Sequence, residues 1–185
     1  MTSDSELIER ARRFDLDALA EIYDRYSPGI YRYVLHLLGD PHQAEDCTAE
    51  AFSRYLQALY EGGGPRDHLQ AYLYRIAHNR VTDLYRRQPP PPLPLSDGLP
   101  SSDPDPIQIV MDRIDKDQVR AALAHLTPDQ RQVIALKYLE GWENEMIAQI
   151  LEKPVGAVKS LQHRAMDALR RMVLPQKEEV VDGNE

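Results

Sequence analysis

The chain has 185 residues, of which 42% are hydrophobic, and carries a formal net charge of −8 at pH 7. No apolar run approaches the roughly 20 residues that a membrane-spanning helix needs, and the first residues lack the apolar core of a signal peptide. The single cysteine, Cys47, excludes a disulfide within the chain, as expected in a reducing compartment. We therefore expect a cytoplasmic protein with no membrane insertion of its own.

The N-terminal half shows helical periodicity throughout. Apolar residues at helical spacing predict helices over residues 15–27, 28–38, 41–60 and 67–87. Pro28 and Gly29 are expected to end the first helix and begin the second, because proline removes a backbone hydrogen bond. Gly39 ends the second helix, and the loop 62–65, Gly-Gly-Gly-Pro, precedes the fourth.

Residues 89–106, PPPPLPLSDGLPSSDPDP, divide the chain. This stretch is rich in proline, serine and aspartate and too poor in apolar residues to pack, which predicts an extended linker. The alternative is a long loop within one domain, but structureless loops of this length are uncommon there. The expected organisation is all-α, with domains over 1–88 and 107–174 and a disordered acidic tail over 175–185.

The C-terminal half opens with a predicted helix over 106–125. The next helix begins at Thr127, which fits the N-cap, with Pro128 at the first position and Gln130 three residues after the cap. No β-strand pattern and no internal repeat is present in this half or in the other.

The segment 141–171, GWENEMIAQILEKPVGAVKSLQHRAMDALRR, predicts a helix, a sharp turn and a second, basic helix. Pro154 is expected at the first position of the second helix, where its missing N–H costs nothing. That helix has an apolar back and a polar front, formed by Lys159, Ser160, His163, Arg164 and Arg171. Such a helix can enter a DNA major groove; the alternative is an ordinary amphipathic hairpin with a solvated basic face.

The acidic net charge does not exclude nucleic acid, because the charge is unevenly distributed. Residues 66–87 contain five arginines and two aspartates, and residues 153–171 contain five basic groups and one aspartate. The local field, rather than the total charge, governs contact with phosphates. We expect the acidic remainder to keep DNA binding by the isolated protein weak.

Three segments, taken in chain order, carry a family resemblance. They are Ala44-Glu45-Asp46 with Glu50, Phe52, Arg54 and Tyr55; residues 71–80 with Asp83, Arg86 and Arg87; and residues 126–128, 138–141, 147–148 and 154–160. Together they resemble RNA polymerase sigma factors of the extracytoplasmic-function (ECF) group of the sigma-70 family. The resemblance implies two helical domains that direct core polymerase to promoters and help open them, with the polymerase supplying all the chemistry.

The resemblance also implies a role for each segment. The first would bind the clamp of the largest polymerase subunit through Asp46, Glu50, Phe52, Arg54 and Tyr55. The second, with a loop pocket for a flipped base, would read the −10 element through Arg66, Arg75, Asn79, Arg80, Asp83, Arg86 and Arg87. The third would read the −35 element through Pro154, Gly156, Ala157, Lys159, Ser160, His163 and Arg164. Further implied partners are the flap of the second-largest subunit, promoter DNA and an anti-sigma protein; no catalytic residue, metal or cofactor is expected.

The chain departs from the family pattern at four positions. Ala49, Tyr72, Glu152 and Leu161 stand where the family usually has glutamine, tryptophan, glycine and a basic residue. Because Leu161 cannot donate a hydrogen bond, the −35 sequence that this chain prefers stays open.

Other interpretations compete at single features. The polar face of the first segment could be a solvated face with an i,i+4 ion pair, and the glycine-rich loop lacks the signature of a phosphate-binding loop. His42 and Cys47 are too few for a zinc site, so Cys47 and Trp142 are interpreted as core residues. Two alternative functions are a stand-alone helix–turn–helix regulator with an N-terminal sensor or dimerisation domain and a protein-binding adaptor.

Overall fold

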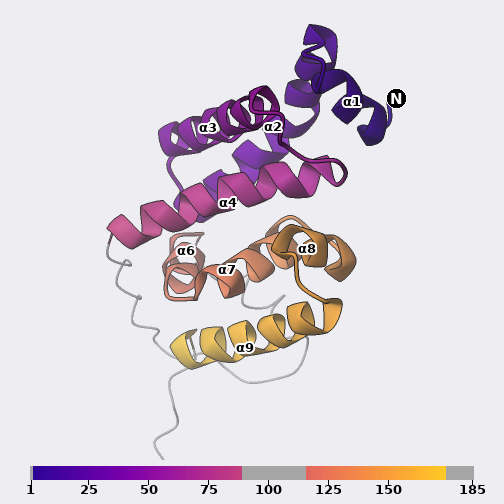
Figure 1. The fold of residues 1–185 in the computed structure, drawn as a ribbon. Coiled ribbons are helices and arrows are strands. Elements are labelled where there is room, and N and C mark those ends of the chain that lie inside the picture. The colour runs from indigo at the N-terminus through magenta and orange to yellow at the C-terminus, as the bar shows by residue number, and fades with distance from the viewer. Residues whose placement is uncertain (1, 89–115, 174–185) are drawn as a thin grey trace, which may run out of the picture.

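The computed structural model describes residues 2–88 and 116–173, and the regular elements in both ranges are helical (Figure 1). The N-terminal half comprises α1 (Asp4–Ala11), α2 (Leu16–Leu38), α3 (Pro41–Tyr60) and α4 (Leu69–Arg87). The C-terminal half comprises α6 (Lys116–Ala124), α7 (Pro128–Ile134), a π-helical turn η1 (Ala135–Leu139), α8 (Asn144–Leu151) and α9 (Val155–Val173).

The all-α prediction is confirmed for these two ranges. The predicted linker, the acidic tail and the first part of the helix predicted over 106–125 lie outside the described residues. None of the described helices combines the length and the apolar content that crossing a bilayer requires.

Local capping signals set several helix boundaries as predicted. Gly39 has a φ of 71°, which ends α2, and the Asp40 carboxylate accepts hydrogen bonds from the backbone N–H groups that open α3. At the start of α7, Thr127 and Gln130 form both hydrogen bonds of a capping box. These short signals depend only on neighbouring residues, so the sequence alone predicts them.

The predicted break at Pro28 is wrong, because α2 runs through it. Buried residues lie on both sides of the proline: Ile22 and Tyr26 precede it, and Ile30 and Tyr33 follow it. A proline inside a helix costs about 3 kcal/mol, but burying one continuous apolar face on the same core offsets that cost. The apolar stripe, rather than the proline, therefore decides the length of α2.

Two further boundaries differ from the sequence analysis. Helix α1 was not predicted, although Ser3 caps it and it buries the apolar residues Leu7, Ile8 and Ala11. Pro154 lies just before α9 rather than at its first position, and its carbonyl accepts hydrogen bonds from the N–H groups of Ala157 and Val158 at 2.9 and 3.1 Å. Pro154 still occupies a site where its missing N–H leaves no intrahelical bond unmade.

Gly29 allows α4 to approach α2 closely. A Cβ atom at Gly29 would lie 2.7 Å from the hydroxyl oxygen of Tyr74. The Tyr74 ring is buried and packs against the rings of Tyr33 and Trp142, with centroid distances of 5.3 and 4.6 Å. Because neighbours hold this ring on two sides, it has little room to withdraw.

We predict that Gly29→Ala destabilises the protein by about 1–2 kcal/mol, because the clash with the Tyr74 hydroxyl exceeds the gain in helix propensity. Urea unfolding measures the change. In a Tyr74→Phe background the same substitution should be neutral or stabilising, since the next ring atom lies 3.8 Å away. An equal loss of stability in both backgrounds would contradict the assignment.

The two halves pack against each other. Helix α4 contacts α8, and α2 contacts both η1 and α6; Figure 1 shows the C-terminal helices lying beneath α4. Buried apolar residues from both halves join in one hydrophobic cluster. The faces of α2 and α4 that point away from α3 and α1 are therefore covered by the chain's own C-terminal half.

Arg131 of α7 lies in this contact and is only 4% exposed. Its Nε donates to the carbonyl of Leu123 at 2.9 Å, and its Nη2 donates to the carbonyls of Ala124 and Leu126 at 3.2 and 2.9 Å. Its guanidinium carbon lies 3.8 Å from the ring centroid of Tyr85 in α4. The Arg131 side chain thus donates hydrogen bonds to carbonyl groups at and just after the end of α6, and it stacks on Tyr85 in the N-terminal half.

Candidate nucleic-acid interface

Helix α9 presents the polar front that the sequence predicted. The proposed −35 contacts are exposed except for the half-buried Ala157; the exposed ones are Pro154, Gly156, Lys159, Ser160, His163 and Arg164. On the opposite side Val158, Leu161 and Ala165 are buried against the C-terminal half. A rigid helix with a buried back and an exposed basic front has the form that major-groove recognition needs.

Two departures from the family pattern have a structural explanation. Leu161 is 9% exposed and belongs to the hydrophobic core, so it does not take the place of a donor on the exposed front. Glu152 has a φ of 51°, the left-handed conformation that glycine adopts without strain. Its carboxylate forms an ion pair with Arg75 of α4, so the turn between α8 and α9 is tied to the other half of the chain.

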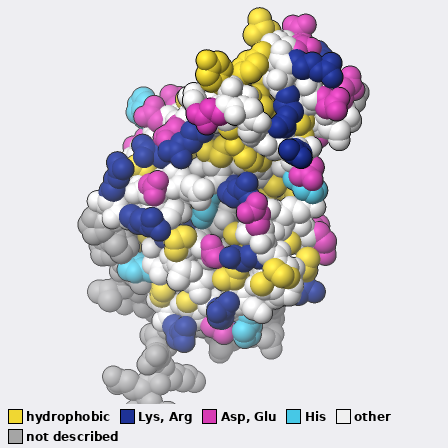
Figure 2. Space-filling view, in the orientation of Figure 1, with side chains coloured by type: hydrophobic (Ala, Val, Ile, Leu, Met, Phe, Trp, Pro, Cys, Tyr) yellow, Lys and Arg dark blue, Asp and Glu magenta, His cyan; other side chains and the backbone are white. Residues whose placement is uncertain are grey.

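The proposed −10 residues divide into exposed and paired groups. Arg66, Asn79, Arg86 and Arg87 are exposed, whereas Arg75, Arg80 and Asp83 are half-buried. The half-buried ones make ion pairs: Arg75 with Glu152, Arg80 with Glu50 at 2.7 Å and Asp83 with Arg86 at 3.8 Å. Figure 2 shows Lys and Arg side chains gathered toward the C-terminal end of α4, on the left of the view. This exposed group offers a cationic surface for phosphates.

The proposed clamp-binding face on α3 is partly engaged within the chain. Asp46 and Arg54 are exposed, while the Glu50 carboxylate pairs with Arg54 at 2.6 Å and with Arg80 at 2.7 Å. Glu50 therefore has the i,i+4 ion pair that the sequence offered as an alternative, and it also links α3 to α4.

The two aromatic residues assigned to the clamp contact lie inside the N-terminal half. Phe52 is 7% exposed and its ring centroid lies 4.8 Å from that of Tyr23, and Tyr55 is 1% exposed. Both side chains pack on the buried face of α3 rather than lie on its exposed face. The exposed apolar side chains of this helix are Leu56 and Tyr60, at 41% and 78%; Tyr60 was not singled out from the sequence, because it falls at the predicted end of its helix.

His78 of α4 is buried under the C-terminal half, a position that the sequence did not reveal. Its Nδ1 lies 2.9 Å from the Tyr33 hydroxyl and its Nε2 lies 3.3 Å from the Thr82 hydroxyl. Burial, and secondarily the charge of Arg131, lower the pKa of His78 from 6.5 to about 4. The imidazole is therefore neutral at physiological pH.

This depressed pKa predicts a loss of stability in mild acid. Below about pH 6.5 His78 becomes protonated in the unfolded chain but stays neutral in the folded protein. The free energy of unfolding therefore falls as the pH drops from about 6.5 toward 4. We expect a loss of about 3 kcal/mol across this window. Urea unfolding of the wild-type protein and of His78→Gln, compared from about pH 7 down to pH 4.5, measures it. A dependence on pH of the same size in the variant would exclude His78 as its source.

The remaining singled-out residues are structural. Cys47 is 1% exposed, as predicted for a core residue, and burial raises the pKa of its thiol. Within residues 2–88 and 116–173, no group of three or more His, Cys, Asp or Glu side chains is arranged to hold a metal ion. Trp142 packs on Tyr74 and so anchors the contact between the halves, rather than the core of its own half alone.

Two family models match the chain in order. The Sigma-70 region 2 model matches residues 22–89, and the Sigma-70, region 4 model matches residues 116–169. This order of regions is that of a sigma-70-type transcription initiation factor.

Relatives place the chain more narrowly. It is 32% identical to the ECF RNA polymerase sigma factor BldN of Streptomyces coelicolor, over 91% of this chain and 65% of that one. It is 33% identical to SigL of Mycobacterium tuberculosis, over 80% and 85%, and 31% identical to SigW of Bacillus subtilis, over 90% and 94%. The chain belongs to the ECF sigma factors of the sigma-70 family, whose function is promoter-specific initiation of transcription with RNA polymerase.

Solved structures show the same fold. CnrH in complex with the cytosolic domain of CnrY matches with a TM-score of 0.64 at 22% identity, over 90% of this chain and 94% of that one. The sigma factor RpoE in complex with the anti-sigma factor NepR, from Bartonella quintana, matches with a TM-score of 0.54 at 18% identity, over 85% and 98%.

Proposed function

We propose that this chain is a non-catalytic cytoplasmic subunit that carries core RNA polymerase to specific promoters. The observation that carries the proposal is the ordered match of sigma-70 regions 2 and 4 to the two halves that bear the exposed polar faces of α3, α4 and α9. A stand-alone helix–turn–helix regulator is not favoured, because its N-terminal half would be a sensor or dimerisation domain. In this chain that half matches sigma-70 region 2 instead.

The polymerase clamp binds α3 through Asp46, Glu50 and Arg54, with Leu56 as the apolar contact. Asp46, Arg54 and Leu56 are exposed and Glu50 is half-buried, whereas Phe52 and Tyr55 pack in the core of the N-terminal half. The C-terminal half contacts the flap of the second-largest subunit. An anti-sigma protein is a further partner, because RpoE, which shares this fold, is found in complex with one.

Promoter DNA binds both halves. The exposed side chains of Asn79, Arg86 and Arg87 on α4, with Arg66 on the preceding loop, contact the opened −10 strand, where a cationic rim and hydrogen bonds to base edges are needed. On α9, Lys159 and Arg164 are long donors at the centre of the exposed front, suited to guanine edges or phosphates.

We predict that Lys159→Ala and Arg164→Ala each reduce promoter-directed transcription roughly 5- to 100-fold, because one good contact to a base pair contributes about 1–3 kcal/mol. Affinity for core polymerase should not change. Arg13→Ala is the matched control, since Arg13 lies at the end of the N-terminal helix and is 78% exposed. Unchanged transcription from both α9 variants would refute the −35 assignment.

A second variant tests the polymerase contact. Asp46→Arg reverses an exposed charge at the N-terminal end of the proposed clamp face and should weaken binding of core polymerase about tenfold or more, because like charges then meet across the interface. Glu9→Arg, on α1, reverses a charge of similar exposure and should bind normally. Equal affinity of the two variants would remove Asp46 from the interface.

The function as a whole is tested by mixing the purified protein with bacterial core polymerase and transcribing sheared genomic DNA. A stable complex with discrete start sites is the expected result. Sequence-specific DNA binding without any polymerase complex would instead establish the stand-alone regulator.

A further inference from the structure

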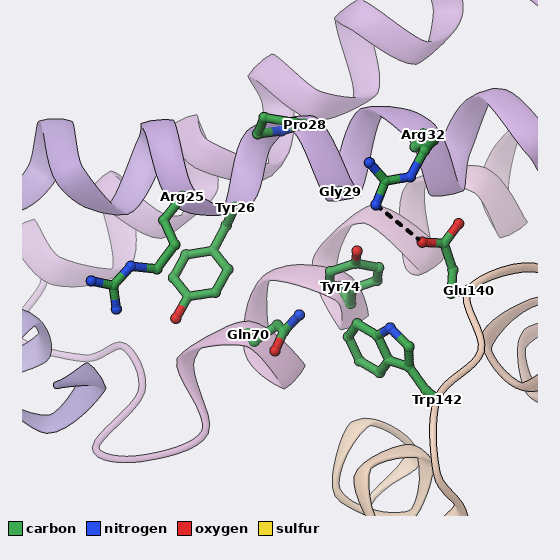
Figure 3. A pocket seen from close by; sticks show the side chains of 9 residues that line it. All are labelled: Arg25, Tyr26, Pro28, Gly29, Arg32, Gln70, Tyr74, Glu140 and Trp142. Carbon is green, nitrogen blue, oxygen red and sulfur yellow. Dashed lines mark ion pairs between the residues drawn. The ribbon is translucent and has the colours of Figure 1, made fainter. Parts of the chain in front are cut away.

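The interface between the halves contains a buried acid. Glu140 follows η1, and its side chain is only 3% exposed. Its carboxylate lies 3.8 Å from Nη2 of Arg32 (Figure 3). It also lies 3.2 Å from Nδ1 of His36, and both partners are on α2. Burying a carboxylate is unfavourable unless a partner compensates its charge, and these two partners come from the other half of the chain.

Aromatic and ionic contacts extend the interface around Glu140. Trp142 packs on Tyr74 of α4 with 4.6 Å between ring centroids, beside a pocket of about 250 Å³ that Arg32 and Glu140 also line (Figure 3). The next residue of α4, Arg75, pairs with Glu152 of the α8–α9 turn. The contact thus engages a proposed −10 residue and holds the −35-reading motif against the −10-reading helix.

This arrangement conflicts with simultaneous reading of two promoter elements. The −10 and −35 elements lie about 25 base pairs apart, or about 85 Å along B-form DNA. A compact chain of this length has a radius of gyration of about 16 Å and is about 40 Å across. With the halves in contact, both DNA-reading surfaces cannot reach their elements on one duplex.

We infer that the face of α2 and α4 is a docking surface for the chain's own C-terminal half, and that docking through Glu140 holds the protein closed. This inference rests on the proposed function. The closed form withholds the promoter-competent arrangement, so that polymerase and promoter capture only chains that have opened. The fraction of open chains then scales the apparent affinity for polymerase.

The test is Arg32→Glu in the full chain. Arg32 is 60% exposed and belongs to none of the proposed binding faces, so the variant should fold, but it places a second carboxylate beside the buried Glu140. We expect the open-to-closed ratio to rise at least about tenfold, since facing like charges are strongly unfavourable. The double variant Arg32→Glu/Glu140→Arg restores opposite charges and should close again, and Arg13→Glu is the exposed control.

Trp142 reports opening directly, because it is the chain's single tryptophan and packs on the interface. Acrylamide quenching of its fluorescence and the radius of gyration from small-angle scattering should both increase in Arg32→Glu only. Binding of core polymerase should then tighten by a similar factor. The quenching and scattering measurements need no polymerase, so they test closure separately from the proposed function.

Three results would overturn the inference. One is an extended wild-type chain in solution, and another is quenching that Arg32→Glu does not change. The third is an open Arg32→Glu chain whose polymerase affinity equals that of the wild type, which would leave the docking without a regulatory effect. Absence of polymerase binding by every variant, together with the expected quenching, would instead count against the proposed function alone.

Discussion

The buried guanidinium of Arg131 is the interaction on which the join between the two halves depends. It satisfies three carbonyl groups at the end of α6 and stacks on Tyr85 of α4. Burial lowers its pKa, and the guanidinium contacts backbone carbonyls and an aromatic ring. A desolvated cation over an aromatic face contributes about 2 kcal/mol or more, so the C-terminal half gains most when α4 covers it.

Burial, with the charge of Arg131 as a second cause, lowers the pKa of His78, which contacts the hydroxyls of Tyr33 and Thr82. A buried cation tolerates no second cation nearby. The two halves therefore specify one another electrostatically: α7 supplies the positive charge, and α4 supplies a ring and an uncharged imidazole. The side chains of Arg86 and Arg87 on α4 and of Lys159 and Arg164 on α9 remain exposed.

The sequence predicted what depends on near neighbours and on one helix face. The end of α2 at Gly39, the cap at Thr127, the buried back of α9 and its basic front all follow from local sequence. What it missed depends on packing across the chain. Nothing local distinguishes Pro28 within a continuous helix from Pro28 at a break, and nothing local shows that Tyr55 lies inward. The pairing of Glu50 with Arg80 joins two segments 30 positions apart, which no periodicity encodes.

Glu152 shows how such a long-range contact can outweigh a local rule. A left-handed backbone costs a residue with a side chain about 1–2 kcal/mol relative to glycine, and the family usually has glycine there. Here the side chain reaches Arg75 on α4, a contact that glycine cannot make. The strain is thus offset by a link between the α8–α9 turn and α4, and that link exists only while the halves are docked. Glu152 is unfavourable within its own turn, but its ion pair with Arg75 stabilises the closed form. Its presence in place of glycine therefore agrees with a functional closed form.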